Sequence, residues 1–229
     1  AAARACVRAT VACLTSAEDE IAPPARVAAA AAARAYLALA VRSAWRADGP
    51  AVVVCTGLSG TGKSTLAAAL ADATDAVLLC SDVIRKRDDP SGRGPATTER
   101  YTAGARAATY ETLAREADAV LAAGRGVIAD ATFMRRADRE RLTRVAARHG
   151  RPCVFVETRA AEAVVRERLA ARTAADLSDA RWDTYVAQRQ AYEPCGVDEP
   201  RIVVDTDGAP SVARAAALRQ LWAWRCAGG

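Results

Sequence analysis

A run of glycines that ends in a lysine and a serine is the segment of this 229-residue sequence with the clearest chemical meaning. It reads Gly57-Leu58-Ser59-Gly60-Thr61-Gly62-Lys63-Ser64, and Thr65 follows it. Glycines allow the backbone to turn its N–H groups inward around phosphate oxygens, and a helix expected after the run adds the positive end of its dipole. We therefore predict that residues 57–65 form a loop that binds the phosphates of ATP.

Two side chains at the end of this loop are expected to have specific roles. Lys63 should reach the β and γ phosphates as a point charge, and the Ser64 hydroxyl should ligate Mg²⁺. The sequence contains only two lysines among its 32 basic residues, so a lysine at this position indicates that an ammonium group is required. A glycine-rich turn without a ligand is the alternative, and the strand-like and helical patterns on either side argue against it.

Carboxylates follow two further apolar runs that are expected to be strands. Asp82 is predicted to take the proton of an acceptor hydroxyl or to hold a metal-bound water, and Arg85 is predicted to contact the acceptor. Asp130 is expected to orient the Mg²⁺ shell or the acceptor, and Thr132 to donate a hydrogen bond. A helix N-cap is the alternative role for Asp82, and a loop cap is the alternative for Asp130 and Thr132.

Arg168 and Arg172 are four residues apart and therefore lie on one face of a predicted helix. They precede the polar stretch 173–179. This arrangement predicts a lid that closes on the nucleotide and neutralises charge on the transferred group. Because arginine is so frequent here, the alternative is simple pairing of these arginines with Glu162 or Glu167.

Short β-branched runs alternate with longer helical patterns from residue 51 onward, which is typical of βαβ units and a parallel sheet. Ligands of such sheets collect where the strands end, so the candidate residues should meet at one edge. The predicted strands are 51–56, 76–80, 126–129, 152–157 and 201–204. The predicted helices are 63–73, 98–123, 135–149, 160–173, 178–192 and 211–225.

Residues 1–48 differ from the rest, because they are helical in pattern and contain no strand signal. The pair Pro23-Pro24 is expected to break this helical region, and 48–50 is expected to be a linker. We therefore predict a helical appendage at 1–48 and one α/β domain at 49–229. The segment 88–95, rich in Asp, Pro, Ser and Gly, is predicted to be a mobile surface loop.

Composition excludes several other kinds of site and partner. A single histidine, His149, argues against a Ser-His-Asp relay or a histidine metal cluster. The seven cysteines include no C-x-x-C pair and are expected to be reduced thiols of a cytoplasmic protein. The net charge of +5 comes from evenly spread arginine, so nucleic acid is not an expected partner. Arg34 and Arg42 interrupt the longest apolar stretch, so no membrane span is expected.

Together these motifs resemble the P-loop kinases of the adenylate, gluconate and polynucleotide kinase type, in particular a bacterial AAA-family group of predicted kinases. The group's pattern of G-x-x-G-x-G-K-S-T, S-D-x-x-R-K, D-A-T-F and R-x-x-x-R followed by S-D-A is matched by residues 57–65, 81–86, 130–133, 168–172 and 178–180. The resemblance spans about residues 51–221. It implies a P-loop NTPase fold of three α/β/α layers with strand order 2-3-1-4-5, Asp82 as the acceptor base and the arginine segment as the lid.

In that group the kinase module is often the C-terminal half of a longer protein whose N-terminal half is similar to an aminoglycoside phosphotransferase. Residues 7–12 and 35–40 resemble the last helices of that partner. The resemblance thus implies that residues 1–48 are the tail of a covalently linked domain and that the chain is part of a longer protein.

The expected function is transfer of the γ-phosphoryl group of ATP, with Mg²⁺, to a hydroxyl of a small molecule. Two alternatives stay open. Transfer to a polynucleotide 5′ end would require strongly salt-dependent binding, for which a charge of +5 without clustered aromatics is a modest basis. A regulatory module that hydrolyses ATP slowly to control a partner domain is the other.

Overall fold

The computed structural model describes residues 1–88, 103–172 and 180–228. The chain divides into two compact units, one made of residues 1–49 with 72–75 and the other of residues 50–71 with 76–229. Most of the predicted surface loop at 88–95, and all of the polar stretch 173–179, lie outside the described residues.

The larger unit is built on a sheet of five parallel strands in the order β2-β3-β1-β4-β5. This order and the parallel arrangement confirm the fold that the sequence predicted. The strands begin or end within about two residues of the predicted positions. They are β1 (Val52–Thr56), β2 (Val77–Cys80), β3 (Val127–Asp130), β4 (Cys153–Arg159) and β5 (Arg201–Asp205).

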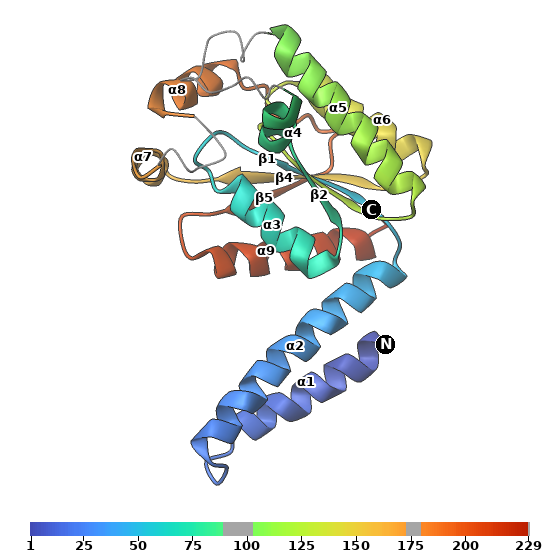
Figure 1. The fold of residues 1–229 in the computed structure, drawn as a ribbon, viewed down its shortest axis with the longest axis vertical. Coiled ribbons are helices and arrows are strands. Elements are labelled where there is room, and N and C mark those ends of the chain that lie inside the picture. Colours follow the sequence, from blue (N-terminus) through green and yellow to red (C-terminus); the bar gives the residue numbers. More distant parts are fainter. Residues whose placement is uncertain (89–102, 173–179, 229) are drawn as a thin grey trace. The chain divides into compact units, whose positions relative to one another are not determined.

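Helices cover both faces of this sheet. Figure 1 shows α5 and α6 on one side of the strands and α3 and α9 on the other. The helices of this unit are α3 (Lys63–Thr74), α4 (Ser81–Asp88), α5 (Ala103–Ala122), α6 (Arg136–Arg148), α7 (Glu162–Ala170), α8 (Trp182–Ala191) and α9 (Pro210–Cys226).

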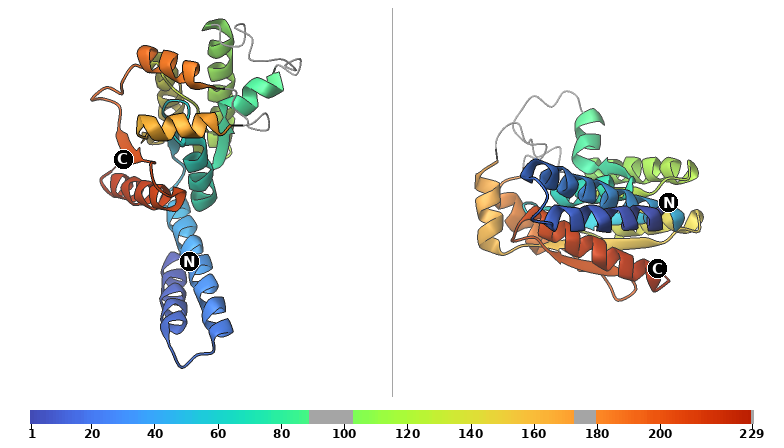
Figure 2. Two further views of the ribbon diagram at one scale, coloured as in Figure 1. Left: turned by 90° about the vertical axis from the view of Figure 1, so that its left-hand side faces the viewer. Right: turned by 90° about the horizontal axis from the view of Figure 1, so that it is seen from below.

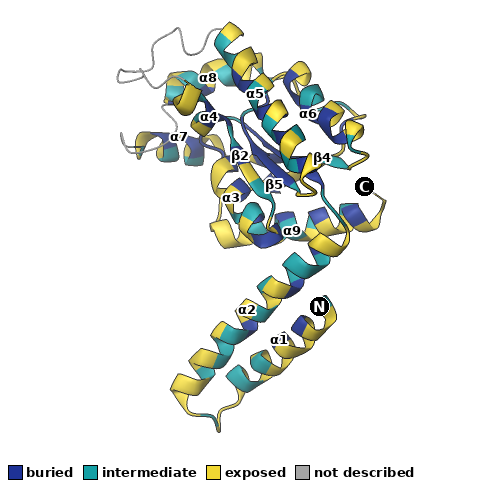
Figure 3. Cartoon of the chain, turned by 45° about the vertical axis from the view of Figure 1, so that its right-hand side comes forward, coloured by how far each residue is buried: buried dark blue, intermediate teal, exposed yellow. Residues whose placement is uncertain are grey.

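The two helical layers explain why the central strands are continuous apolar runs rather than alternating ones. Every residue of β1 is buried, and Figure 3 shows dark blue, buried strands at the centre of the sheet. Val52 and Val54 join the core under α5 and α6, which includes Leu113 and Leu142. Burial of this kind fixes the register of the sheet, and the register places the strand ends side by side.

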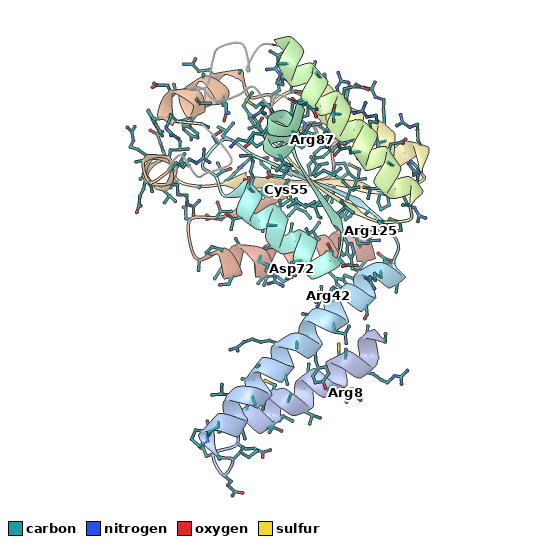
Figure 4. All side chains as sticks on the ribbon, in the orientation of Figure 1. Arg8, Arg42, Cys55, Asp72, Arg87 and Arg125 are labelled. Carbon is teal, nitrogen blue, oxygen red and sulfur yellow. The ribbon has the colours of Figure 1, made fainter. Side chains whose placement is uncertain are left out.

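Helix α4 was not among the predicted helices, although a helix N-cap was the alternative role given to Asp82. Its residue types suit a helix that begins directly after β2, with Asp82 in the first turn and three basic residues in the last turn. This distribution of charge complements the helix dipole. Arg87, labelled in Figure 4, joins α4 to α5 through an ion pair of 2.7 Å with Glu116.

The smaller unit contains α1 (Ala2–Ala17) and α2 (Pro23–Ala47), which pack side by side as a helical hairpin (Figure 2). The pair Pro23-Pro24 forms the first turn of α2, where a missing backbone N–H costs nothing. The buried positions of the two helices are mainly small residues, Ala5 and Ala9 on α1 and Ala33 and Ala40 on α2.

Helix α2 is long and apolar enough to span a membrane, with a mean hydropathy of 1.3 over its best window. The expectation that Arg34 and Arg42 would exclude this was wrong, because the alanines, valines and leucines of α2 outweigh two charges. Only 11% of that window is buried within the structure. Signal sequences and core helices of soluble proteins meet the same criteria, so length and composition alone do not place α2 in a membrane.

Candidate functional site

The predicted phosphate loop connects the end of β1 to the start of α3. Its glycines include Gly57 with φ 144° and Gly60 with φ 82°. Residues that carry a side chain rarely adopt these backbone conformations. A Cβ on Gly57 would lie 2.4 Å from Thr158 Oγ1, and a Cβ on Gly60 would lie 2.9 Å from Val165 Cγ1. Both backbone geometry and space therefore require glycine at these two positions.

Threonine hydroxyl groups stabilise the loop through hydrogen bonds. Thr61 Oγ1 donates to the carbonyl of Leu58 at 2.8 Å and lies 2.8 Å from Thr158 Oγ1 on β4. Thr206, which follows β5, donates to the carbonyl of Thr61 at 2.7 Å. The loop is thus held by two strands other than the one it follows.

Lys63, Ser64 and Thr65 form the first turn of α3. The Lys63 side chain is buried and lies close enough to Asp130 for its charge to act on that carboxyl. Ser64 and Thr65 are exposed. The structure therefore places the predicted lysine inside the site, beside Asp130, and leaves Ser64 and Thr65 accessible from solvent.

Asp130 ends β3 and is a buried carboxylate at the edge of the sheet. It is 3% exposed, and its Oδ1 atom has no hydrogen-bond partner in the described part of the chain. Its Oδ2 atom accepts a long bond of 3.4 Å from Cys80 Sγ. Burial raises the pKa of Asp130, while Lys63 and a hydrogen bond from Ser64 oppose the rise.

This arrangement fits a cation better than it fits an acceptor contact. A buried carboxylate oxygen without a partner is costly unless something pairs with it, and hard cations such as Mg²⁺ prefer oxygen ligands. The Ser64 hydroxyl and Asp130 supply two such ligands. No cluster of three or more potential metal ligands occurs among residues 1–88, 103–172 and 180–228. A site with few protein ligands suits Mg²⁺, which keeps waters and binds phosphate oxygens.

The sheet register explains how these groups meet. Cys55 on β1 and Cys80 on β2 are both paired with Asp130 on β3. Cys55 is labelled in Figure 4 and is completely buried, so burial raises the pKa of its thiol strongly. Asp82 lies two residues beyond Cys80 and raises the pKa of Asp130 through its charge. The ends of three strands thus bring both predicted carboxylates to the phosphate loop.

Asp82 lies in the first turn of α4 and forms an ion pair with Arg85, whose Nη1 atom is 2.6 Å from Asp82 Oδ1. Arg85, which the sequence analysis assigned to the acceptor, is therefore engaged by the proposed base in this structure. Both side chains remain partly exposed, at 19% for Asp82 and 28% for Arg85.

Thr132 braces the loop from the β3 side. Its carbonyl accepts a bond of 2.8 Å from Thr56 Oγ1 and one of 3.4 Å from the Gly57 N–H. Its hydroxyl lies 3.3 Å from the Tyr110 hydroxyl, which also accepts a bond of 3.0 Å from the Phe133 N–H. Tyr110 was not found by sequence reasoning, because a tyrosine inside a long helical pattern carries no motif.

The two arginines of the predicted lid make backbone contacts. Arg168 donates to the carbonyl of Thr206 at 2.5 Å and to that of Gly60 in the loop at 3.4 Å. Arg172 donates to the carbonyl of Ala180 at 3.1 Å. Glu162, offered as an alternative partner for them, pairs with other arginines, Arg166 and Arg189.

Two other contacts were missed because their partners are far apart in the sequence. Arg139 is completely buried and pairs with Glu199, with Nε 2.6 Å from Oε1. Gln188 of α8 accepts a bond of 2.8 Å from the Ser59 N–H in the loop. Arginine is frequent in this sequence, and a single glutamine belongs to no motif. Neither residue could therefore be identified from the sequence.

Fold and site together define a P-loop domain with a parallel five-stranded sheet and a buried carboxylate beside the loop lysine. Residues 52–194 match the model of an AAA domain family (AAA_33), and the chain belongs to this family. No curated protein matches the chain.

Several solved structures are similar. A sugar kinase from Janibacter sp. HTCC2649 is 25% identical with a TM-score of 0.58, over 75% of this chain and 94% of that chain. A gluconokinase from Sinorhizobium meliloti 1021 is 23% identical with a TM-score of 0.54, over 77% and 93%. The APS kinase of Mycobacterium tuberculosis in complex with AMPPNP and APS is 18% identical with a TM-score of 0.54, over 76% and 98%. These likenesses confirm the predicted P-loop kinase fold.

Proposed function

We propose that this protein is an ATP- and Mg²⁺-dependent kinase that transfers the γ-phosphoryl group of ATP to a hydroxyl of a small molecule. The observation that carries the proposal is the position of Asp130, whose buried Oδ1 atom has no partner among the described residues and which lies beside Lys63 and Ser64. A second carboxylate, Asp82, lies at the same sheet edge.

In this proposal the loop N–H groups and Lys63 bind the phosphates of ATP. Ser64 and Asp130 would hold Mg²⁺, which when bound neutralises charge on the β and γ phosphates. Asp82 accepts the proton of the acceptor hydroxyl, and its ion pair with Arg85 orients it. Arg168, which donates to the Gly60 carbonyl of the loop, and Arg172, four residues further on, contribute positive charge for the transferred group. Thr132 positions the loop rather than the acceptor.

The acceptor class has support from the similar structures. Two of them are named as a sugar kinase and a gluconokinase, and these names point to small hydroxylated acceptors. The structure described with AMPPNP supports ATP as the nucleotide.

The test is a screen for ATP consumption across sugars, aminoglycosides, nucleosides and oligonucleotides, with Lys63→Ala and Asp82→Asn beside the unmodified protein. We expect Lys63→Ala to lose nucleotide binding and Asp82→Asn to bind ATP but lose transfer. Undiminished transfer by Asp82→Asn would remove the proposed base.

Two other results would favour different functions. ATP hydrolysis without any acceptor would favour a regulatory module. Labelling of oligonucleotide ends that weakens steeply with salt would favour a polynucleotide kinase.

A further inference from the structure

Two helices, α7 and α8, contact the phosphate loop. Leu58 of the loop packs against a small apolar cluster that contains Val165 and Leu169 of α7 and Tyr185 of α8. Gly60 lies so close to α7 that a Cβ there would meet Val165. Successive residues of the loop are therefore in contact with the same pair of helices.

Ser59, which stands between Leu58 and Gly60, contacts α8 through a hydrogen bond. The Ser59 N–H donates to Gln188 Oε1 at 2.8 Å, across 129 residues of sequence. Because a backbone N–H is a donor, the side-chain atom that faces it must be the oxygen of the amide. Ser59 is 3% exposed with Gln188 in place, so a side chain of equal length without an oxygen would leave this N–H with little access to water.

Helix α8 is itself held firmly, so Gln188 presents its oxygen from a fixed position. Tyr185 precedes Gln188 by three residues, lies on the same helix face and is buried. Its ring stacks on Trp182 with centroids 5.0 Å apart, and the Arg166 guanidinium of α7 lies 3.9 Å from the centre of the Trp182 ring. These contacts join α7 to α8, and the apolar cluster that Trp182 borders also contacts Leu58 of the loop.

From these contacts we infer that Gln188 is a positioning residue for nucleotide binding, which fixes the Ser59 peptide so that the rest of the loop keeps its inward-facing N–H groups. The inference rests on the proposed function, because it requires that the loop binds the phosphates of a nucleotide. Gln188 acts through Ser59 and touches no phosphate. Its effect is specific for ligands that carry a β phosphate, since these are the ligands that need the loop.

Loss of the amide oxygen leaves the Ser59 N–H without a partner in a buried position. The Ser59 peptide can regain a hydrogen-bond acceptor only by rotating, and this rotation would disturb the loop residues that follow. The penalty for an unsatisfied buried donor corresponds to about a tenfold loss of affinity.

The test compares Gln188→Met with Gln190→Met in the full chain. Methionine keeps the length of the side chain but lacks an oxygen, and Gln190 is an exposed glutamine of the same helix. We expect the Kd for ADP to rise about tenfold in Gln188→Met and to stay unchanged in Gln190→Met. The Kd for adenosine, which has no phosphate, should be unchanged in both variants. Gln188→Ala removes the same oxygen with less bulk and provides the measurement if the methionine variant does not fold.

Equal affinity of the Gln188 and Gln190 variants for ADP would overturn the inference. A parallel loss of ADP and adenosine binding would also overturn it, because this would show a general structural role. If the unmodified protein binds ADP but transfers phosphate to no acceptor, the proposed kinase function fails and the role of Gln188 stands. If the unmodified protein binds no ADP, the loop is not a nucleotide site and the inference about Gln188 fails with it.

Discussion

Asp82 and Arg85 are joined by an ion pair at the start of α4, with Arg85 Nη1 2.6 Å from Asp82 Oδ1. The pair fixes the carboxylate that we propose as the base. We predict that Arg85→Met lowers kcat about tenfold, because a base that is free to rotate spends less time in the productive position. KM for ATP should change less than about twofold. Steady-state kinetics with the acceptor found in the screen measure both values.

Lys86→Met is the control for this variant, because it removes the same charge from the same helix. An equal loss of kcat in Lys86→Met would show that net charge, and not the pair with Asp82, is responsible.

The burial of Asp130 predicts a conflict between stability and activity. Burial raises the pKa of this carboxyl, so the ionised form is disfavoured in the folded protein. The stability that the protonated carboxyl contributes is therefore lost as pH rises through the raised pKa. At pH 7, Asp130→Asn should therefore increase the free energy of unfolding by about 1 kcal/mol. The melting temperature should rise by about 2–4 °C.

The same variant should lose phosphoryl transfer, because the amide is a poor ligand for Mg²⁺. Asp183→Asn, at an exposed position of α8, should change neither property. Thermal unfolding followed by circular dichroism and the transfer assay measure the two effects. A less stable Asp130→Asn that keeps full transfer would contradict both the metal role and the cost of burial.

The buried pair of Arg139 and Glu199 is predicted to be important for stability. The guanidinium donates two bonds to Glu199 and others to the carbonyls of Phe133, Glu193 and Pro194. Arg139→Leu leaves the carboxylate buried and unpaired, so we expect a loss of about 3–5 kcal/mol in urea unfolding.

Replacing both partners of this pair with leucine should cost less than the single replacement, since no charge remains uncompensated. A double variant that is less stable than Arg139→Leu would show that the carbonyl contacts of Arg139, rather than its pairing with Glu199, dominate.

Glu199 also makes stability depend on pH. Burial opposes its ionisation, but the hydrogen bonds from Arg139 and the Gly196 N–H outweigh burial and lower the pKa of Glu199. A lowered pKa contributes stability above the ordinary glutamate value of about 4.3, and this stability is lost as pH falls through the folded-state pKa. We expect the melting temperature of Glu199→Gln to fall less steeply with acid than that of the unmodified protein. Parallel acid profiles of the two proteins would contradict this prediction.

Gly60 is predicted to be necessary for the loop for two separable reasons. Gly60→Ala introduces strain at φ 82° and a clash 2.9 Å from Val165, whereas Gly124→Ala at φ 72° introduces strain in open space. Both variants should lose about 1 kcal/mol of stability from the backbone. Only Gly60→Ala should lose ADP binding, measured by titration calorimetry. Normal ADP binding by Gly60→Ala would mean that the loop tolerates displacement from α7.

Much of the fold was predictable because its signals are local. Continuous apolar runs such as the one in β1 indicated strands covered on both faces, and the glycine pattern at residues 57–62 indicated the loop between strand and helix. Helix α4 was missing from the predicted helices because its eight residues are too few to show a helical period, although an N-cap role was considered for Asp82.

The sequence by itself determined the parallel sheet, the phosphate loop with Lys63 and Ser64, and the two carboxylates that follow strands, since each depends on neighbouring residues. The tertiary structure alone decided which partners these groups have. Strand register put Asp130 beside Cys80, and packing of α8 put Gln188 on Ser59. Such contacts join residues up to 129 positions apart, and they depend on burial and register that no local pattern encodes.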